Sequence, residues 1–292
     1  MVFFSSKKSL VAEINYFRLQ FHMMTGRILF ILFIFFVSCC KAYAGNLGFG
    51  AHSGFGVIKY EEHSTALGTN HEAESKQNAF LFGVSGEYSF PKPENFYAGI
   101  TTDWAVGLED EETWKNNSAK SQTNDMRIFG QFYDFRFGYK DSVDSFYYRL
   151  YVSGGWDGLH FKRSNFVLSG IAVSGTVTED FSLWRTGAGL GLGYKPGKWA
   201  LDGRLAYSYY PIGSVKNSSY PDITFDTNGT CLDMGIGIAR EITKRINFYA
   251  GVSYTLIELD ESNIMRSGSR QVIFPNSKTE IILGVANLTY AF

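Results

Sequence analysis

An acidic run is the first feature of this sequence whose residue types could do chemistry. Residues 109–112 read EDEE, and Asp103 precedes them on the same alternating segment. Carboxylates gathered at one point could form an acidic site. The competing interpretation is a solvated loop face, which is the usual role of an acidic run of this length.

Histidine is the residue that most often acts as a general base near neutral pH. Four histidines follow residue 45, at positions His52, His63, His71 and His160. The sequence contains no GxSxG or HExxH motif, and Cys231 is the one cysteine after residue 45. We therefore expect no cofactor and no metal. The net charge of −1, without a basic run, gives no reason to expect nucleic-acid binding.

The N-terminal segment has the pattern of a secretory signal peptide. Residues 27–44, RILFILFIFFVSCCKAYA, place a positive charge before an apolar core and end in a small-x-small cleavage pattern. We predict cleavage after Ala44, so that residues 1–44 are an extension plus signal peptide and residues 45–292 form one domain. Lipoprotein processing at Cys39 is the alternative. Three methionines could start synthesis: Met1, Met23 or Met24.

Alternating apolar and polar residues cover almost all of the remaining chain. This period of two is typical of strands that separate two different environments. We predict ten strands, near residues 46–60, 77–90, 95–109, 125–140, 145–160, 180–195, 198–211, 229–242, 245–259 and 277–292.

The connections between these strands alternate strictly between short and long. The short ones carry turn residues: PKPE at 91–94, DSVD at 141–144, PGK at 196–198 and TK at 243–244. The long ones are polar and lie near residues 61–76, 110–124, 161–179, 212–228 and 260–276. This asymmetry predicts an all-β protein, an antiparallel up-and-down transmembrane β-barrel with long extracellular loops and short periplasmic turns. Greek-key connections of a β-sandwich would break the rhythm.

The two faces of the predicted strands differ as a barrel in lipid requires. One face is apolar, as Leu205 and Val252 illustrate, and the other carries small residues and charges. The charged inward positions have both signs: His52, Glu87, Asp103, Asp134, Arg136, Arg149, Asp157, Arg185, Asp202, Arg204 and Asp233. Mixed charges in a narrow interior favour paired side chains over a wide pore. A narrow solute channel is kept as an alternative.

The chain ends on an aromatic residue in the middle of this pattern. In the final stretch SKTEIILGVANLTYAF, the alternate residues back from Phe292 are apolar. A terminal aromatic residue resembles the C-terminal signature that the barrel assembly machinery of Gram-negative bacteria reads. The sequence therefore predicts residence in the outer membrane, with outer-membrane lipid, lipopolysaccharide and, through Phe292, this machinery as partners.

In layout and in two local stretches the sequence resembles the omptins, the outer-membrane proteases. TTDWAVGLEDEETW at 101–114 lies where omptins carry an aspartate pair, and YSYYPIGSVKNSSYPDITFD at 207–226 lies where they carry an Asp-x-His motif. The resemblance implies peptide hydrolysis at the barrel mouth. The implied catalytic residues are Asp103, Glu109, Asp110 and His160. The stretch 207–226 contains no histidine, which disfavours this activity.

The remaining hypothesis is a non-enzymatic surface barrel, either an adhesin or receptor or a structural component of the envelope, with an external ligand at its loops. The segment 161–179 is unusual for a solvated loop because residues 166–177 are largely apolar. It predicts either a β-hairpin that turns at Ser169-Gly170 and extends the barrel or a loop folded over the mouth. We place this surface function first and an omptin-like protease second.

Overall fold

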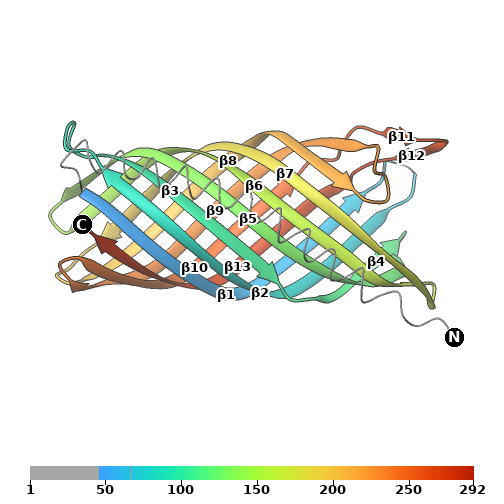
Figure 1. Ribbon diagram of the computed structural model, residues 1–292, viewed down its shortest axis with the longest axis horizontal. Coiled ribbons are helices and arrows are strands. Elements are labelled where there is room, and N and C mark those ends of the chain that lie inside the picture. Colours follow the sequence, from blue (N-terminus) through green and yellow to red (C-terminus); the bar gives the residue numbers. More distant parts are fainter. Residues whose placement is uncertain (1–45, 67) are drawn as a thin grey trace, which may run out of the picture. The chain divides into compact units, whose positions relative to one another are not determined.

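The computed structural model describes residues 46–66 and 68–292, which form an antiparallel β-barrel (Figure 1). The predicted signal peptide, with its cleavage site after Ala44, lies outside the described residues. Within them, no helix is long and apolar enough to span a membrane.

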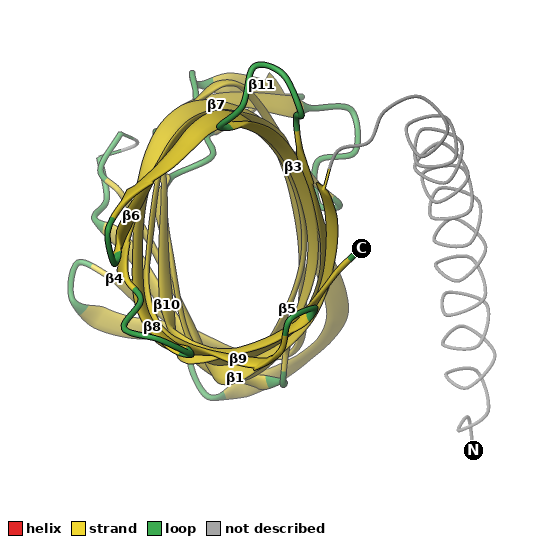
Figure 2. Ribbon diagram, turned by 90° about the vertical axis from the view of Figure 1, so that its left-hand side faces the viewer, coloured by secondary structure: helices red, strands yellow, loops and turns green. Residues whose placement is uncertain are grey.

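The strands are β1 (Asn46–Ser64), β2 (His71–Ser89), β3 (Phe96–Gly107), β4 (Asp110–Asn116), β5 (Ala119–Val143), β6 (Phe146–Leu168), β7 (Ile171–Tyr194), β8 (Trp199–Asn217), β9 (Thr224–Thr243), β10 (Ile246–Leu259), β11 (Met265–Ser267), β12 (Arg270–Val272) and β13 (Asn276–Ala291). The main sheet has eleven of them, and β11 and β12 form a separate hairpin. Pairing of β1 with both β2 and β13 closes the sheet into a ring (Figure 2). Closure leaves no open edge in the hydrocarbon, where unpaired backbone groups are costly.

β3 and β4 together occupy one position of the ring, so that the barrel has ten strand positions. Both strands pair with β2 and with β5, and residues 108–109, which lie outside strands, separate β3 from β4. The side chain of Gln77, which is fully buried, compensates for this break: its Oε1 accepts the backbone N–H of Ile128 at 3.1 Å. The predicted ten-stranded architecture is confirmed.

An apolar band surrounds the barrel near the end that carries the short turns, here called the short-turn end. Outward side chains such as Phe55, Val152 and Ile236 are exposed there, as lipid contact requires. Toward the other end, here called the long-connection end, outward side chains become polar, as with Glu61 in β1 and Lys162 in β6. The predicted faces are confirmed, since Leu205 and Val252 belong to the exposed apolar set.

The structure differs from the prediction in where the strands end. Most residues of four predicted loops continue as paired strand beyond the apolar band. Among the described residues of these loops, only 65–66, 68–70, 117–118, 169–170 and 218–223 lie outside strands. The tight turn at Ser169-Gly170, with both φ angles positive, confirms the predicted hairpin. Such a turn matches the twist of the strands it joins.

Glycines on the inner face of β7 accept tyrosine rings from β6. A Cβ atom on Gly189 would lie 2.4 Å from the Tyr151 ring, and one on Gly193 would lie 2.0 Å from the Tyr147 ring. Any larger residue at these two positions would displace the ring. The repeated glycines of residues 189–193 therefore make room for larger side chains from the neighbouring strand.

Candidate functional site

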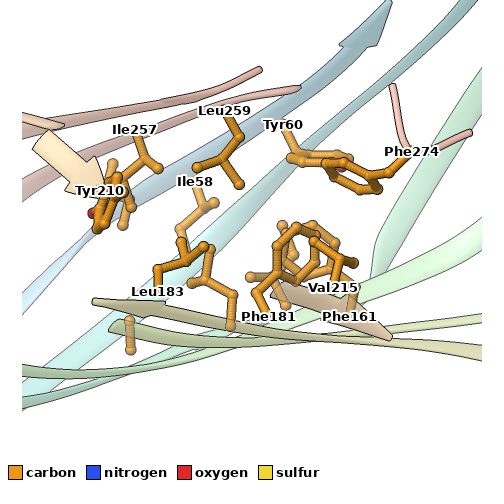
Figure 3. Close-up of a cluster of buried hydrophobic side chains, with 14 of the residues drawn as sticks. Ile58, Tyr60, Phe161, Phe181, Leu183, Tyr210, Val215, Ile257, Leu259 and Phe274 are labelled. Atoms are coloured by element: carbon orange, nitrogen blue, oxygen red, sulfur yellow. The ribbon is translucent and has the colours of Figure 1, made fainter. Parts of the chain in front are cut away.

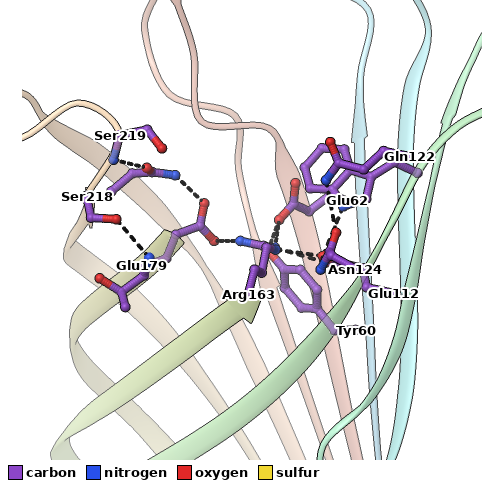
Figure 4. A network of polar contacts seen from close by, with 12 residues as sticks. Tyr60, Glu62, Glu112, Gln122, Asn124, Arg163, Glu179, Ser218 and Ser219 are labelled. Carbon is purple, nitrogen blue, oxygen red and sulfur yellow. Dashed lines mark hydrogen bonds and ion pairs between the residues drawn. The ribbon is translucent and has the colours of Figure 1, made fainter. Parts of the chain in front are cut away.

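The mouth of the barrel at the long-connection end contains a buried cluster centred on Arg163 of β6 (Figure 4). Its guanidinium donates from Nε to Glu112 at 2.7 Å, from Nη2 to Glu62 at 2.8 Å and from Nη1 to Glu179 at 2.5 Å. The three glutamates come from β4, β1 and β7, so one side chain links strands on different sides of the ring. All four residues are buried.

A second set of polar side chains surrounds these carboxylates. The Trp114 indole N–H and the Asn124 amide both donate to Glu112 Oε2, at 2.9 and 2.8 Å. Asn217 donates to Glu179 at 2.7 Å, and the Tyr60 hydroxyl donates to Glu62 at 2.6 Å. Each glutamate therefore has at least two donors, which offsets much of the cost of burying its charge.

The cluster holds three carboxylates and one guanidinium, and this imbalance affects Glu62. Burial raises the pKa of Glu62 from its ordinary value of 4.5 to about 7; Arg163 opposes the change, and the carboxylates of Glu179 and Glu112 add to it. Outward neighbours of Glu62 in β1 are polar, so this carboxyl lies beyond the lipid-facing band. The Glu62 carboxyl therefore takes up a proton as the pH falls through about 7.

An apolar layer fills the lumen next to the Arg163 cluster (Figure 3). Its rings form a chain: Tyr60 and Phe161 have centroids 4.6 Å apart, Phe161 and Phe181 4.6 Å, and Phe181 and Phe274 5.5 Å. Leu183 is also fully buried in this layer. Side chains from opposite walls thus meet inside the barrel, and the lumen is occupied here by a packed core.

The connection between β10 and β13 covers this layer. Its Phe274 and Val272 are buried in the same apolar cluster. The backbone N–H of Ser262 donates to the carbonyl of Phe274 at 3.0 Å, and the Phe274 N–H donates to Ser262 Oγ at 2.9 Å. The segment that folds over the mouth is therefore 260–275, whereas the apolar segment 161–179 extends the barrel as a hairpin.

Nearer the short-turn end, the lumen is crossed by paired charges. Arg185 lies 3.4 Å from Asp134, 3.6 Å from Asp157 and 3.3 Å from Asp233. Further pairs join His52 to Asp103, Arg136 to Asp134, Lys140 and Arg149 to Glu87, and the hydroxyl of Tyr147 to Asp202. Paired charges in the interior are what the mixed signs of the inward residues predict.

The structure does not bring the four residues implied by the omptin resemblance to one site. Asp103 points into the lumen and contacts His52. Glu109 lies in the interruption after β3, and Asp110 begins β4 with an exposed side chain. His160 points outward, because its neighbours Leu159 and Phe161 are the buried residues of that stretch. Its Nδ1 lies 2.7 Å from Asp180 Oδ1 on the outer wall.

The other two histidines after residue 45 lie at the rim of the long-connection end: His71 is on the inward face of β2, opposite Ser64, and His63 is on the outward face of β1. His71 Nδ1 contacts the Asn116 side chain at 2.7 Å, and His63 lines a concave region of the outer wall with a volume of about 580 Å³. Carboxylates such as Glu74 and Asp260 line the same region together with Lys278. Among the described residues, no group of three histidine, cysteine or acidic side chains has the arrangement of a metal site.

Comparison with known proteins identifies the fold of this chain. No protein-family model matches the sequence. No curated protein matches it either. The outer membrane protease OmpT from Escherichia coli has a similar structure, with a TM-score of 0.61 at 12% identity over 86% of this chain and 99% of that one. Weaker similarity extends to the translocator domain of the autotransporter NalP from Neisseria meningitidis, with a TM-score of 0.37 at 14% identity over 97% of each chain. The similarity to OmpT shows that the fold is that of an outer-membrane β-barrel.

The Arg163 cluster and the apolar layer are the features that the sequence did not predict. Several of their inward residues, such as Glu62, Phe161 and Glu179, lie in segments that were assigned to loops. One signal was present: Leu159, Phe161 and Arg163 keep the period of two beyond the expected strand end. It is difficult to recognise because the outward residues between them, including Lys162, are polar instead of apolar.

Proposed function

We propose that this protein is a non-enzymatic surface barrel of the outer membrane, with its long-connection end toward the cell exterior, where it acts as an adhesin or receptor. The observation that supports this proposal is that the mouth of the barrel is filled by side chains. The Arg163 cluster, the apolar layer and the covering Phe274 occupy the space in which a substrate groove or a solute path would run. Because the lumen is filled, other molecules would bind to the outer surfaces of the extended strands and to their connections.

The dispersed histidines support a non-enzymatic function. Hydrolysis of an amide near neutral pH needs a base such as histidine close to the reacting water. His52 is engaged with Asp103 in the lumen, and His160 lies on the outer wall beside Asp180. The alternative is an omptin-like protease with a divergent site, and the similarity of fold to the protease OmpT is the observation in its favour.

A peptidase assay separates these two functions. The full chain, refolded with lipopolysaccharide, is incubated with peptides that contain paired basic residues. We expect no turnover above that of the His160→Ala and Asp110→Ala variants. Turnover by the unsubstituted protein that either substitution abolishes would overturn the proposal and establish the protease.

A binding assay tests the adhesin class directly. Cells that produce the protein are compared with cells that produce a variant in which a Gly-Ser turn replaces residues 165–176 of the β6–β7 hairpin. We expect weaker attachment of the variant to host cells or extracellular matrix. A matched replacement of residues 141–144 at the short-turn end should leave attachment unchanged, and equal attachment by all three would contradict the proposal.

We further propose that outer-membrane lipid and lipopolysaccharide surround the apolar band and that the assembly machinery recognises Phe292. The Phe292 ring is exposed on the outer face, where it packs edge-on against Tyr290 with centroids 4.8 Å apart. Its backbone N–H donates to the carbonyl of Leu47 at 2.9 Å, next to the β1–β13 closure. A ring in this position is accessible in the closed barrel.

A further inference from the structure

The β6–β7 hairpin leaves one strand edge without a neighbour. Pairing of β7 with β8 starts at Glu179 opposite Asn217, and one further contact joins Thr178 to Ser218 through bonds of 2.8 and 2.9 Å. On its other side β7 pairs with β6 to the tip of the hairpin. Within the described part of the chain, residues 171–177 have no strand partner on the β8 side. We call these seven residues the open edge.

The open edge is exposed on all sides except that of β6. Ile171 is 70% exposed and Val173 is 41% exposed, although both are large apolar residues. A Cβ atom added to Gly175 would meet no atom within 4 Å. The backbone N–H and C=O groups on this side are therefore available for hydrogen bonds to another strand.

The open edge lacks charge and proline, two of the features that usually protect such an edge, although its pairing with β6 shifts register opposite Ser174 and Gly175. It reads IAVSGTV, with no charged residue and no proline. Soluble and surface β-proteins generally place lysine, proline or a covering loop at an exposed edge, because an unprotected edge adds strands from other chains. Partner recognition by β-strand addition uses this same geometry.

We propose that the open edge pairs with the open edge of a second copy of this chain in a facing membrane, so that the protein joins two outer membranes. The inference deepens the proposed adhesin function and rests on it. Any antiparallel register of IAVSGTV against itself places only uncharged side chains opposite one another. The contact is therefore self-complementary, as a two-fold interface requires.

Symmetry determines that the second copy lies in a different membrane. The two-fold axis that relates an antiparallel pair of identical strands is perpendicular to the sheet. The sheet here is the wall of the barrel, which stands upright in the membrane. The two-fold axis therefore lies in the membrane plane. Rotation about this axis turns the partner upside down relative to the first copy. One seven-residue pair is weak by itself, but many copies on each surface act together through multivalency.

The test uses outer-membrane vesicles shed by cells that produce the full chain. Two vesicle populations carry donor and acceptor lipid dyes, and energy transfer reports tethering. We expect transfer when both populations carry the protein and none when only one does. Val173→Lys and Thr176→Pro should each reduce tethering at least tenfold, since one adds charge to the edge and the other removes a backbone donor.

Ser219→Lys is the matched control, since it adds the same charge as Val173→Lys at an exposed position in the neighbouring β8–β9 connection, outside the open edge. It should tether as well as the unsubstituted protein, and heat-modifiable migration should show that all variants are folded. Absence of tethering by the unsubstituted protein, or equal tethering to protein-free vesicles, would overturn the inference. Attachment to host cells or matrix by a protein that fails to tether would leave the adhesin class intact and remove only self-pairing.

Discussion

At the scale of single residues, Arg163 is the side chain on which the mouth of the barrel depends. Burial of a guanidinium is tolerated here because carboxylates from three strands accept its hydrogen bonds. A buried ion cluster of this kind does not necessarily add stability compared with apolar residues. Removal of one member is costly, however, because the partners remain buried and charged.

Arg163→Met therefore tests the cluster. It leaves Glu62, Glu112 and Glu179 together without their cation, and we expect the free energy of unfolding to fall by about 3–5 kcal/mol. The measurement is the urea midpoint of the refolded barrel. Lys195→Met, which breaks a solvent-exposed pair with Glu241 (3.0 Å) near the short-turn end, should cost less than about 1 kcal/mol. Equal effects of the two substitutions would show that Arg163 has no special role.

The raised pKa of Glu62 predicts a pH dependence of stability. Its pKa is about 7 in the folded protein against an ordinary value of 4.5, so the folded state binds more protons between these values. The contribution of the protonated Glu62 carboxyl to the stability of the folded protein is thus fully present below about pH 4.5 and is lost as the pH rises through 7. Urea midpoints at pH 5 and pH 8 should differ less in Glu62→Gln than in the unsubstituted protein. The same difference in both proteins would refute this assignment.

At the scale of the elements, the alternating pattern predicts each strand only where its two faces meet lipid and lumen. There the outward residues are apolar and the inward ones small or charged, so that the ranges for β3, β10 and β13 were nearly correct. Beyond the apolar band both faces contain polar residues, and pairing with neighbours decides the structure. This is why β5, β6 and β7 extend further than the sequence predicts, and why the Arg163 cluster was missed.

The assignment of faces has its own test. Val252→Arg or Leu205→Arg places a charge on the lipid-facing wall and should cost about 2–4 kcal/mol near the middle of the bilayer. The neighbouring inward residues Ser253 and Ala206 should tolerate asparagine much better. The comparison is the fraction of heat-modifiable barrel that each variant forms under matched refolding conditions. Similar losses on both faces would indicate a register that is wrong by one residue.

At the scale of the whole molecule, closure of the ring joins the two ends of the described chain. β1 pairs with β13 along sixteen residue pairs, from Gly48 opposite Ala291 to His63 opposite Asn276. The barrel is therefore complete only when these two strands, which come from opposite ends of the described chain, have paired. A recognition residue at the end of β13 is well placed for this step.

Deletion of Phe292 should reduce assembly in cells. The backbone contact to Leu47 and the ring contacts with Phe49 and Tyr290 would be lost together with the proposed recognition signal. The amount of folded protein in the outer membrane is the readout, and refolding of the purified variant in detergent should change little. Unchanged assembly in cells would show that the assembly machinery does not need Phe292.

The central claim is that the lumen is closed by the Arg163 cluster and the apolar layer, so that function belongs to the outer surfaces. Electrical conductance across a planar lipid bilayer tests it most directly. Refolded protein whose insertion is verified by heat-modifiable migration is added to the bilayer in concentrated potassium chloride. The packed lumen predicts no stable conductance steps, whereas reproducible steps from the full chain would contradict a closed barrel and favour the channel.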